Sequence, residues 1–124
     1  MYENFQNISQ EKRKRIIDAC FNEFAEKGYE MASTNSMVKN VGISKGLLFH
    51  YFGCKKNIYL YILDYVTDYY IDYMLKCMKV NNPDFFKRII EWTELKMYIS
   101  TQNPLLYKFF TNAYINIPEE LKED

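Results

Sequence analysis

The stretch Gly42-Ile43-Ser44-Lys45-Gly46-Leu47-Leu48-Phe49-His50-Tyr51-Phe52 decides the fold of this 124-residue chain. Gly42 can adopt the positive φ of a sharp turn, and the Ser44 hydroxyl can accept a hydrogen bond from the first turn of a helix. Leu48 and Phe52 are four residues apart, so they share one helical face and can anchor it to a core. Because so short a helix is not stable alone, the stretch predicts neighbouring helices that hold it.

Two amphipathic helices are expected before this stretch. The first begins after Ser9 and runs to about Lys27, where Gly28 ends it. Its apolar residues follow i, i+3, i+4 spacing and are Ile16, Ile17, Cys20, Phe21 and Phe24. The second is capped by Ser33 or Thr34, has its apolar face at Met37, Val38 and Val41, and ends at Gly42. Together the three helices form a helix-turn-helix unit. Residues 1–8 are expected to be a loose arm.

A long helix without Gly or Pro is expected from Cys54 to about Val80. Its apolar stripe is Ile58, Ile62, Val66, Tyr69, Tyr73 and Cys77, and its opposite, solvated stripe is Asp64, Asp68 and Asp72. Asn82-Pro83 and Asn103-Pro104 each combine an N-cap with a proline at the first helical position. The first is expected to open a helix with Phe85, Phe86, Ile89, Trp92, Leu95 and Ile99 inward. The second opens one with Leu105, Leu106, Phe109, Phe110 and Ala113 apolar, and Pro118 starts another. The fold class is all-α.

Charge is unevenly distributed along the chain, although the formal net charge is zero. Residues 1–56 hold nine Lys and Arg against six Asp and Glu, whereas residues 57–124 hold seven against ten. A basic first part beside an acidic remainder is typical of a nucleic-acid-facing module joined to another unit, and chance patchiness is the alternative. Lys12 to Arg15 lie at a helix start, where the dipole disfavours cations. Either an external anion or simple solvation explains that cluster.

Several function classes are excluded by what the sequence lacks. Cys20, Cys54 and Cys77 form no CxxC or Cys/His cluster, so neither a disulfide framework nor a metal site is expected. A reducing, cytoplasmic setting follows. No signal peptide or membrane-length apolar run is present, and no membrane partner is expected. One histidine, no phosphate-binding glycine loop and no nucleophile elbow argue against an enzyme, and no cofactor is expected.

Residues 34–56 resemble the TetR/AcrR family of bacterial transcriptional regulators. Their glycines, aromatic pair and following lysines, from Gly42 to Phe52 and then Lys55-Lys56, match the family pattern G-V-S-K-G-T-L-Y-x-Y-F followed by a polar residue, Lys and an acidic residue. Three residues depart from it: Leu47 replaces a small residue, Phe49 replaces tyrosine, and Cys54 replaces a good helix cap. The resemblance implies a helix-turn-helix domain over residues 1–53 and an incomplete helical sensor domain over residues 54–124.

The resemblance also implies a mechanism in which the short helix lies in the major groove of operator DNA. The implied DNA-binding residues are Thr34, Ser44, Lys45, Gly46, Leu47, Phe49, His50, Tyr51 and Lys55. Lys45 and Leu47 are expected to contact bases, whereas Tyr51, Lys55 and Thr34 are expected to contact phosphates.

The sensor domain implied by the resemblance binds a small-molecule effector, for which a tyrosine-rich lining suggests an aromatic or amphipathic molecule. The candidates are Tyr65, Tyr69, Tyr73, Trp92 and Phe109, although an aromatic residue at helical spacing is more often ordinary core. A homodimer is expected if the family's C-terminal helices are present, and 124 residues are fewer than a complete member usually has. The chain is therefore expected to be a ligand-responsive repressor. The alternative is a truncated, non-enzymatic helical protein that pairs with other regulator subunits without binding DNA.

Overall fold

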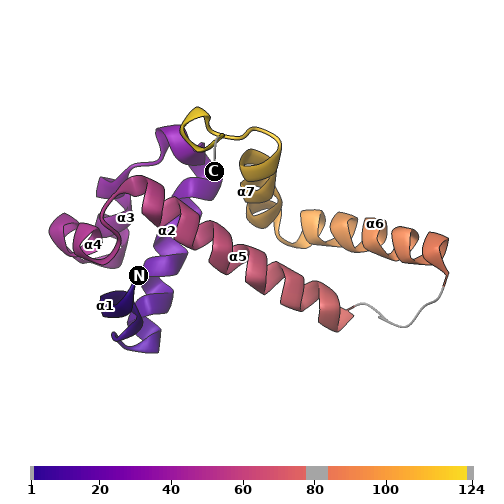
Figure 1. Ribbon diagram of the computed structural model, residues 1–124, viewed down its shortest axis with the longest axis horizontal. Helices are drawn as coiled ribbons and strands as arrows, with labels where there is room; N and C mark the ends of the chain where they lie inside the picture. The colour runs from indigo at the N-terminus through magenta and orange to yellow at the C-terminus, as the bar shows by residue number, and fades with distance from the viewer. Residues whose placement is uncertain (1, 78–83, 123–124) are drawn as a thin grey trace.

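The structure is a computed structural model that describes residues 2–77 and 84–122. Within these ranges the chain is helical and contains no strand, which confirms the all-α fold class. The elements are α1 (Glu3–Gln6), α2 (Gln10–Met31), α3 (Thr34–Val41), α4 (Lys45–Phe52), α5 (Lys55–Cys77), α6 (Phe85–Gln102), α7 (Pro104–Tyr114) and the 3-10 turn η1 (Glu119–Leu121). Helices α1 to α4 gather around one end of α5, and α6 extends beside the other end (Figure 1).

Helix α2 is the central helix of the N-terminal group. Ser9 caps it as expected, because its hydroxyl oxygen accepts a hydrogen bond from the Lys12 backbone N–H at 3.2 Å. Gly28 interrupts the helix with a φ of +75°, a value that favours glycine, and a final turn continues to Met31. The expected apolar face is buried at Ile16, Ile17, Cys20 and Phe24. Burial raises the pKa of the Cys20 thiol to about 12, so the thiol stays protonated at neutral pH.

The expectation of a loose arm over residues 1–8 is wrong. Residues Glu3–Gln6 form helix α1, and Phe5 is completely buried. The Phe5 ring lies 4.9 Å from the Phe52 ring and 5.5 Å from the Tyr51 ring, so α1 covers the inner face of α4. Arg13 of α2 donates to the Gln6 carbonyl oxygen at 2.7 Å. This cation therefore sits at the carbonyl end of α1, which explains one of the four charges at the start of α2.

Helix α5 is buried on one face over its first three turns. Ile58, Ile62 and Val66 lie in the core as expected. Tyr69 is 62% exposed and Tyr73 is only partly buried, so the predicted apolar stripe is not fully buried beyond Val66. The acidic stripe is solvated as expected, and Asp72 forms an ion pair with Lys76 at 2.9 Å. The Cys77 side chain and the residues up to Val80 lie outside the described part. The stripe ends because α5 leaves the N-terminal group beyond Val66 (Figure 1).

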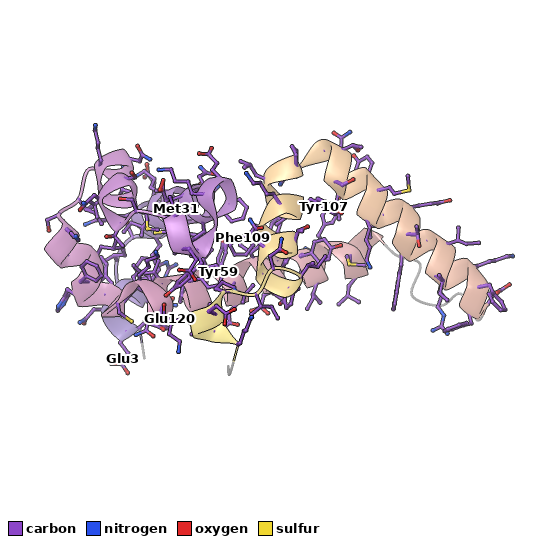
Figure 2. All side chains as sticks on the ribbon, turned by 90° about the horizontal axis from the view of Figure 1, so that it is seen from above. Glu3, Met31, Tyr59, Tyr107, Phe109 and Glu120 are labelled. Atoms are coloured by element: carbon purple, nitrogen blue, oxygen red, sulfur yellow. The ribbon has the colours of Figure 1, made fainter. Side chains whose placement is uncertain are left out.

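Helix α7 packs against α2 and connects the second half of the chain to the first. Asn103 caps it as expected, with its side-chain oxygen accepting from the Leu106 N–H at 3.2 Å. Leu106, Phe109 and Ala113 are buried. Phe109 lies next to Tyr59 of α5, whereas Tyr107 of the same helix points the other way (Figure 2). After α7, the turn η1 buries Leu121 and ends near α2.

Helix α6 buries only the last part of the face that its sequence predicts, fully at Ile99 and partly at Leu95. Phe86 is 75% exposed and Trp92 is 48% exposed, and Phe85 and Ile89 are also exposed. Ile99 is the residue that this helix buries. Asp84 provides the cap, accepting from the N–H groups of the next turn, while Asn82-Pro83 lies outside the described residues. The prediction fails because no described element packs along the outer turns of α6 (Figure 1).

Candidate nucleic-acid interface

The turn between α3 and α4 has the geometry that its sequence predicts. Ser33 caps α3, and Gly42 ends it in the left-handed region with a φ of +84°. The Gly42 N–H donates to the Val38 carbonyl oxygen at 2.8 Å. A Cβ at Gly42 would meet no atom within 4 Å, so the backbone conformation, and not space, requires glycine here. Ser44 then caps α4 by accepting from the Leu47 N–H at 3.1 Å, which completes a helix-turn-helix.

The inner face of α4 is held by aromatic packing. Leu48 is 1% exposed and Phe52 is 4% exposed. The Phe52 ring lies 4.9 Å from Phe5, 5.4 Å from Tyr2 and 5.3 Å from Tyr61. An eight-residue helix is therefore fixed by α1 and α5, and its orientation is set by buried rings.

The outer face of α4 is free at the N-terminal end of the helix. Ser44, Lys45 and Gly46 are exposed, and Leu47 and Phe49 are half-buried. The Lys45 ammonium lies 5.8 Å from the centre of the Phe49 ring, a weak cation–π contact. Nothing lies within 4 Å of a Cβ built on Gly46, so a large partner can approach the backbone there. These residues form one surface at the start of α4.

The remaining predicted DNA-binding residues lie around this surface in different environments. Thr34 is the first residue of α3 and is half-buried. His50 is exposed, and its Nε2 atom lies 3.2 Å from the side-chain nitrogen of Asn4. Tyr51 is only 9% exposed, and its ring packs edge-on against Phe5. Tyr51 therefore mainly supports the core, whereas His50 is accessible to a partner.

Lys55, the first residue of α5, is engaged with the end of α2. Its Nζ atom donates to the Glu30 carbonyl oxygen at 3.3 Å and lies 4.8 Å from the centre of the Tyr29 ring. The Tyr29 hydroxyl in turn donates to a carboxylate oxygen of Glu120 in η1 at 2.7 Å. Burial, followed by this hydrogen bond, raises the pKa of Tyr29, so the hydroxyl stays protonated and remains a donor. A chain of contacts thus joins the C-terminal turn to the helix start beside α4.

Sequence reasoning missed Glu23, which holds α3 against α2. Its carboxylate is 6% exposed, accepts from the Ser33 N–H at 3.1 Å and pairs with Lys27 at 2.9 Å. Ser33 is the N-cap of α3, so Glu23 fixes the start of the first helix of the motif. The position of Glu23 in the sequence could have indicated its burial, because it lies between the buried residues Cys20 and Phe24 on the apolar face of α2.

The predicted effector-binding residues are not brought together. Tyr65 lies on the side of α5 that faces Gln6 and Arg13, and Tyr69 and Trp92 are exposed. Tyr73 is half-buried against the core, and Phe109 is in the core. A cavity of about 440 Å³ lies instead between α5, α6 and α7. It is lined by Thr67, Tyr70, Lys96, Ile99, Tyr107, Phe110, Thr111, Tyr114 and Ile115. Sequence reasoning identified the aromatic character of this region but not which aromatic residues share a cavity.

Neither a metal-binding cluster nor a membrane-spanning helix is found among the described residues. No group of three His, Cys, Asp or Glu side chains in residues 2–77 and 84–122 is arranged to hold a metal. Cys20 and Cys54 are both free thiols. Within the same ranges, none of the helices combines the length and the apolar character needed to span a bilayer.

Comparisons with known proteins point to one family. A sequence model described as bacterial regulatory proteins, tetR family, matches residues 16–62, which cover α2 to the start of α5. The HTH-type transcriptional repressor AcnR of Corynebacterium diphtheriae is 39% identical over 49 residues, which cover 40% of this chain and 26% of that protein. The HTH-type transcriptional regulator UidR of Escherichia coli is 38% identical over 56 residues, 45% of this chain and 29% of that protein.

A solved structure extends the likeness beyond the motif. A TetR family transcriptional regulator from Chloroflexus aurantiacus superposes with a TM-score of 0.78 at 28% sequence identity. The match covers 94% of this chain and 54% of that protein, so the chain spans about half the length of that regulator. The alignment includes the helices after α4, in which the sequence alone carried no diagnostic motif.

Proposed function

We propose that the protein is a transcriptional repressor of the tetR family that binds operator DNA through α3 and α4, because residues 16–62 match the model of bacterial regulatory proteins of that family. The observation that carries the proposal is the two-sided character of α4. Leu48 and Phe52 fix its inner face, while Ser44 to Gly46 are exposed at its N-terminal end. A recognition helix needs this combination of a rigid support and a free first turn. The name of the relative AcnR, a transcriptional repressor, supports repression over activation.

We assign base contacts to Lys45 and Leu47 and phosphate contacts to Lys55 and Thr34. Lys45 can donate to the acceptor edge of guanine, and Leu47 can touch a thymine methyl group. Lys55 lies at the first turn of α5, whose N-terminus also favours a phosphate. To bind one, its ammonium group exchanges the Glu30 carbonyl oxygen for a phosphate oxygen. We therefore predict that the charge of Lys55 raises the affinity for all DNA sequences alike and does not influence which sequence is preferred.

We also propose how the chain is divided into domains and what it binds. Residues 1–53 are the DNA-binding domain, and residues 54–124 are part of a sensor domain that responds to a small molecule. Two copies bind a palindrome whose half-sites are about 34–36 Å apart, because a two-fold protein reads a two-fold site. Action on bacterial DNA places the protein in the cytoplasm. The protein acts by binding and does not catalyse a reaction.

The decisive experiment selects bound sequences from random double-stranded DNA and then measures affinity for the selected duplex at several salt concentrations. We expect Lys55→Ala to weaken binding to all sequences alike and to reduce the salt slope by about one unit. Lys45→Ala and Leu47→Ala should instead change which sequence is preferred. Lys87→Ala, on exposed α6, is the matched control and should change neither. Absence of DNA affinity at low salt would favour the alternative, a helical protein that pairs with regulator subunits.

A further inference from the structure

The cavity between α5, α6 and α7 combines aromatic walls with a single charge. Tyr70 and Phe110 lie with their ring centres 5.0 Å apart, and Phe110 stacks on Tyr114 at 6.0 Å with an angle of 20° between the rings. Among the described residues that line the cavity, Lys96 is the only charged one. The Tyr114 and Thr67 hydroxyl oxygens lie 3.3 Å apart on the same wall. The lining therefore presents flat apolar surfaces, a few hydroxyl groups and one cation.

We infer that this cavity binds a small molecule with an apolar body, preferably aromatic, and one negative charge such as a carboxylate. A volume of about 440 Å³ lies in the range of pockets that enclose small organic ligands. Aromatic side chains favour a flat apolar body, and Lys96 favours an anion over a neutral or cationic head group. No acidic side chain is among the described lining residues, so a cation finds no counter-charge there.

Helix α7 is placed to report the presence of this ligand to the DNA-binding domain. Phe110 faces the cavity, while its neighbour Phe109 contacts the other side, 5.2 Å from Phe21 of α2 and 5.9 Å from Tyr59 of α5. Lys108 donates to the Glu26 carbonyl oxygen of α2 at 2.9 Å. A ligand that displaces Phe110 therefore changes the packing of α7 on α2, the helix that carries α3 through Glu23. This relay rests on the proposed function, whereas the ligand preference does not.

Three probes that share one body test the ligand preference: 4-phenylbutyrate, 4-phenylbutanol and 4-phenylbutylamine. Calorimetric titration of the chain should give the tightest binding for the carboxylate, about fivefold better than the alcohol, and the weakest for the amine. Lys96→Met keeps the apolar stem and should abolish the difference between carboxylate and alcohol. Lys87→Met, on the same helix but outside the cavity, should leave it unchanged. Tyr114→Ala alters an exposed wall residue and should weaken all three probes.

Other results would overturn the inference. Equal binding of the three probes, preference for the amine, or the same carboxylate preference in Lys96→Met would each contradict an anion site. Sedimentation that shows self-association displacing the probes would mean that a second copy occupies the cavity. A folded chain that binds selected DNA but none of the probes would refute the ligand class and leave the proposed function intact.

The relay has its own test. At a concentration that just saturates the unmodified chain, 4-phenylbutyrate should lower its affinity for the selected duplex. At the same concentration the effect should be smaller in Tyr114→Ala, because this variant binds less of the probe. If the carboxylate binds and DNA affinity does not change, the relay through α7 is wrong while the site stands. If DNA binding is absent throughout, the proposed function fails, and the ligand preference is still decided by the titrations.

Discussion

Helices α4 and α6 both carry large apolar side chains, but in opposite environments. Helix α4 has eight residues, and its Leu48 is 1% exposed. Helix α6 has eighteen residues, yet its Phe86 is 75% exposed. The shorter helix is the better fixed, because α1 and α5 cover its inner face, whereas the outer turns of α6 have no described neighbour. Neighbours, and not length, decide how firmly these two helices are held.

This difference matches the roles that we propose for the two regions. A helix that reads bases must keep its orientation, because a small displacement removes base contacts while phosphate contacts persist. A sensor region must instead change its packing when a ligand binds, and segments with few buried contacts open at low free-energy cost. The DNA-facing helix is therefore expected to be the stable part and the wall around the cavity the adaptable one.

Leu48→Ala should have the largest effect, because it removes a fully buried side chain from the support of α4. We expect the free energy of unfolding to fall by about 2–5 kcal/mol, measured by urea denaturation followed by circular dichroism. The matched change Ile90→Ala on exposed α6 should cost well under half of that. Equal losses in the two variants would show that the two helices are equally buried in solution.

Glu23→Ala should have the next largest effect, and it tests the attachment of α3 to α2. Its removal leaves the Ser33 N–H without its carboxylate partner at a half-buried position. We expect a loss of about 1–3 kcal/mol in the same denaturation experiment. Glu30→Ala, which alters an exposed carboxylate on the same helix, serves as the control. A change of less than about 0.5 kcal/mol for Glu23→Ala would mean that other contacts fix α3.

Ser44→Ala should destabilise the chain by about 1 kcal/mol, because it removes the N-cap of α4. Ser44→Asn supplies another good cap without adding a charge and should restore stability. If the alanine variant loses DNA affinity and the asparagine variant recovers stability without recovering affinity, Ser44 also contacts DNA. Recovery of both would assign it to capping alone.

The fold of the first 66 residues could largely be predicted from sequence, because its signals are local. Glycine at Gly28 and Gly42, and serine at Ser9 and Ser44, mark the helix ends directly. The exception is α1, since a single buried Phe5 in a polar segment gives no periodic pattern. Its burial depends on the rings of α4 and α5, which are contacts that spacing cannot report.

The site could be predicted only in part. The motif identifies the residues at the start of α4, but the engagement of Lys55 with Glu30 and the role of Glu23 depend on how α2 meets its neighbours. The residues that line the cavity could not be predicted, because helical spacing alone does not show which aromatic residues of α5 to α7 face one another. Tyr70 and Tyr69 are adjacent in sequence, yet the first lines the cavity and the second is exposed. Which residue faces inward is set by the position of α7.

Phe86→Ser should have the smallest effect and gives the sharpest test of the comparison. Phe86 lies in the first turn of α6, is largely exposed and contacts the Phe85 ring at 5.9 Å. Serine is tolerated near a helix start, so we expect the unfolding free energy to change by less than about 0.5 kcal/mol. A loss above about 1 kcal/mol that grows with protein concentration would mean that a second copy covers this face. In that case α6 would be a helix whose inward face was predicted correctly but is buried only by association, and its contrast with α4 would disappear on dimerisation.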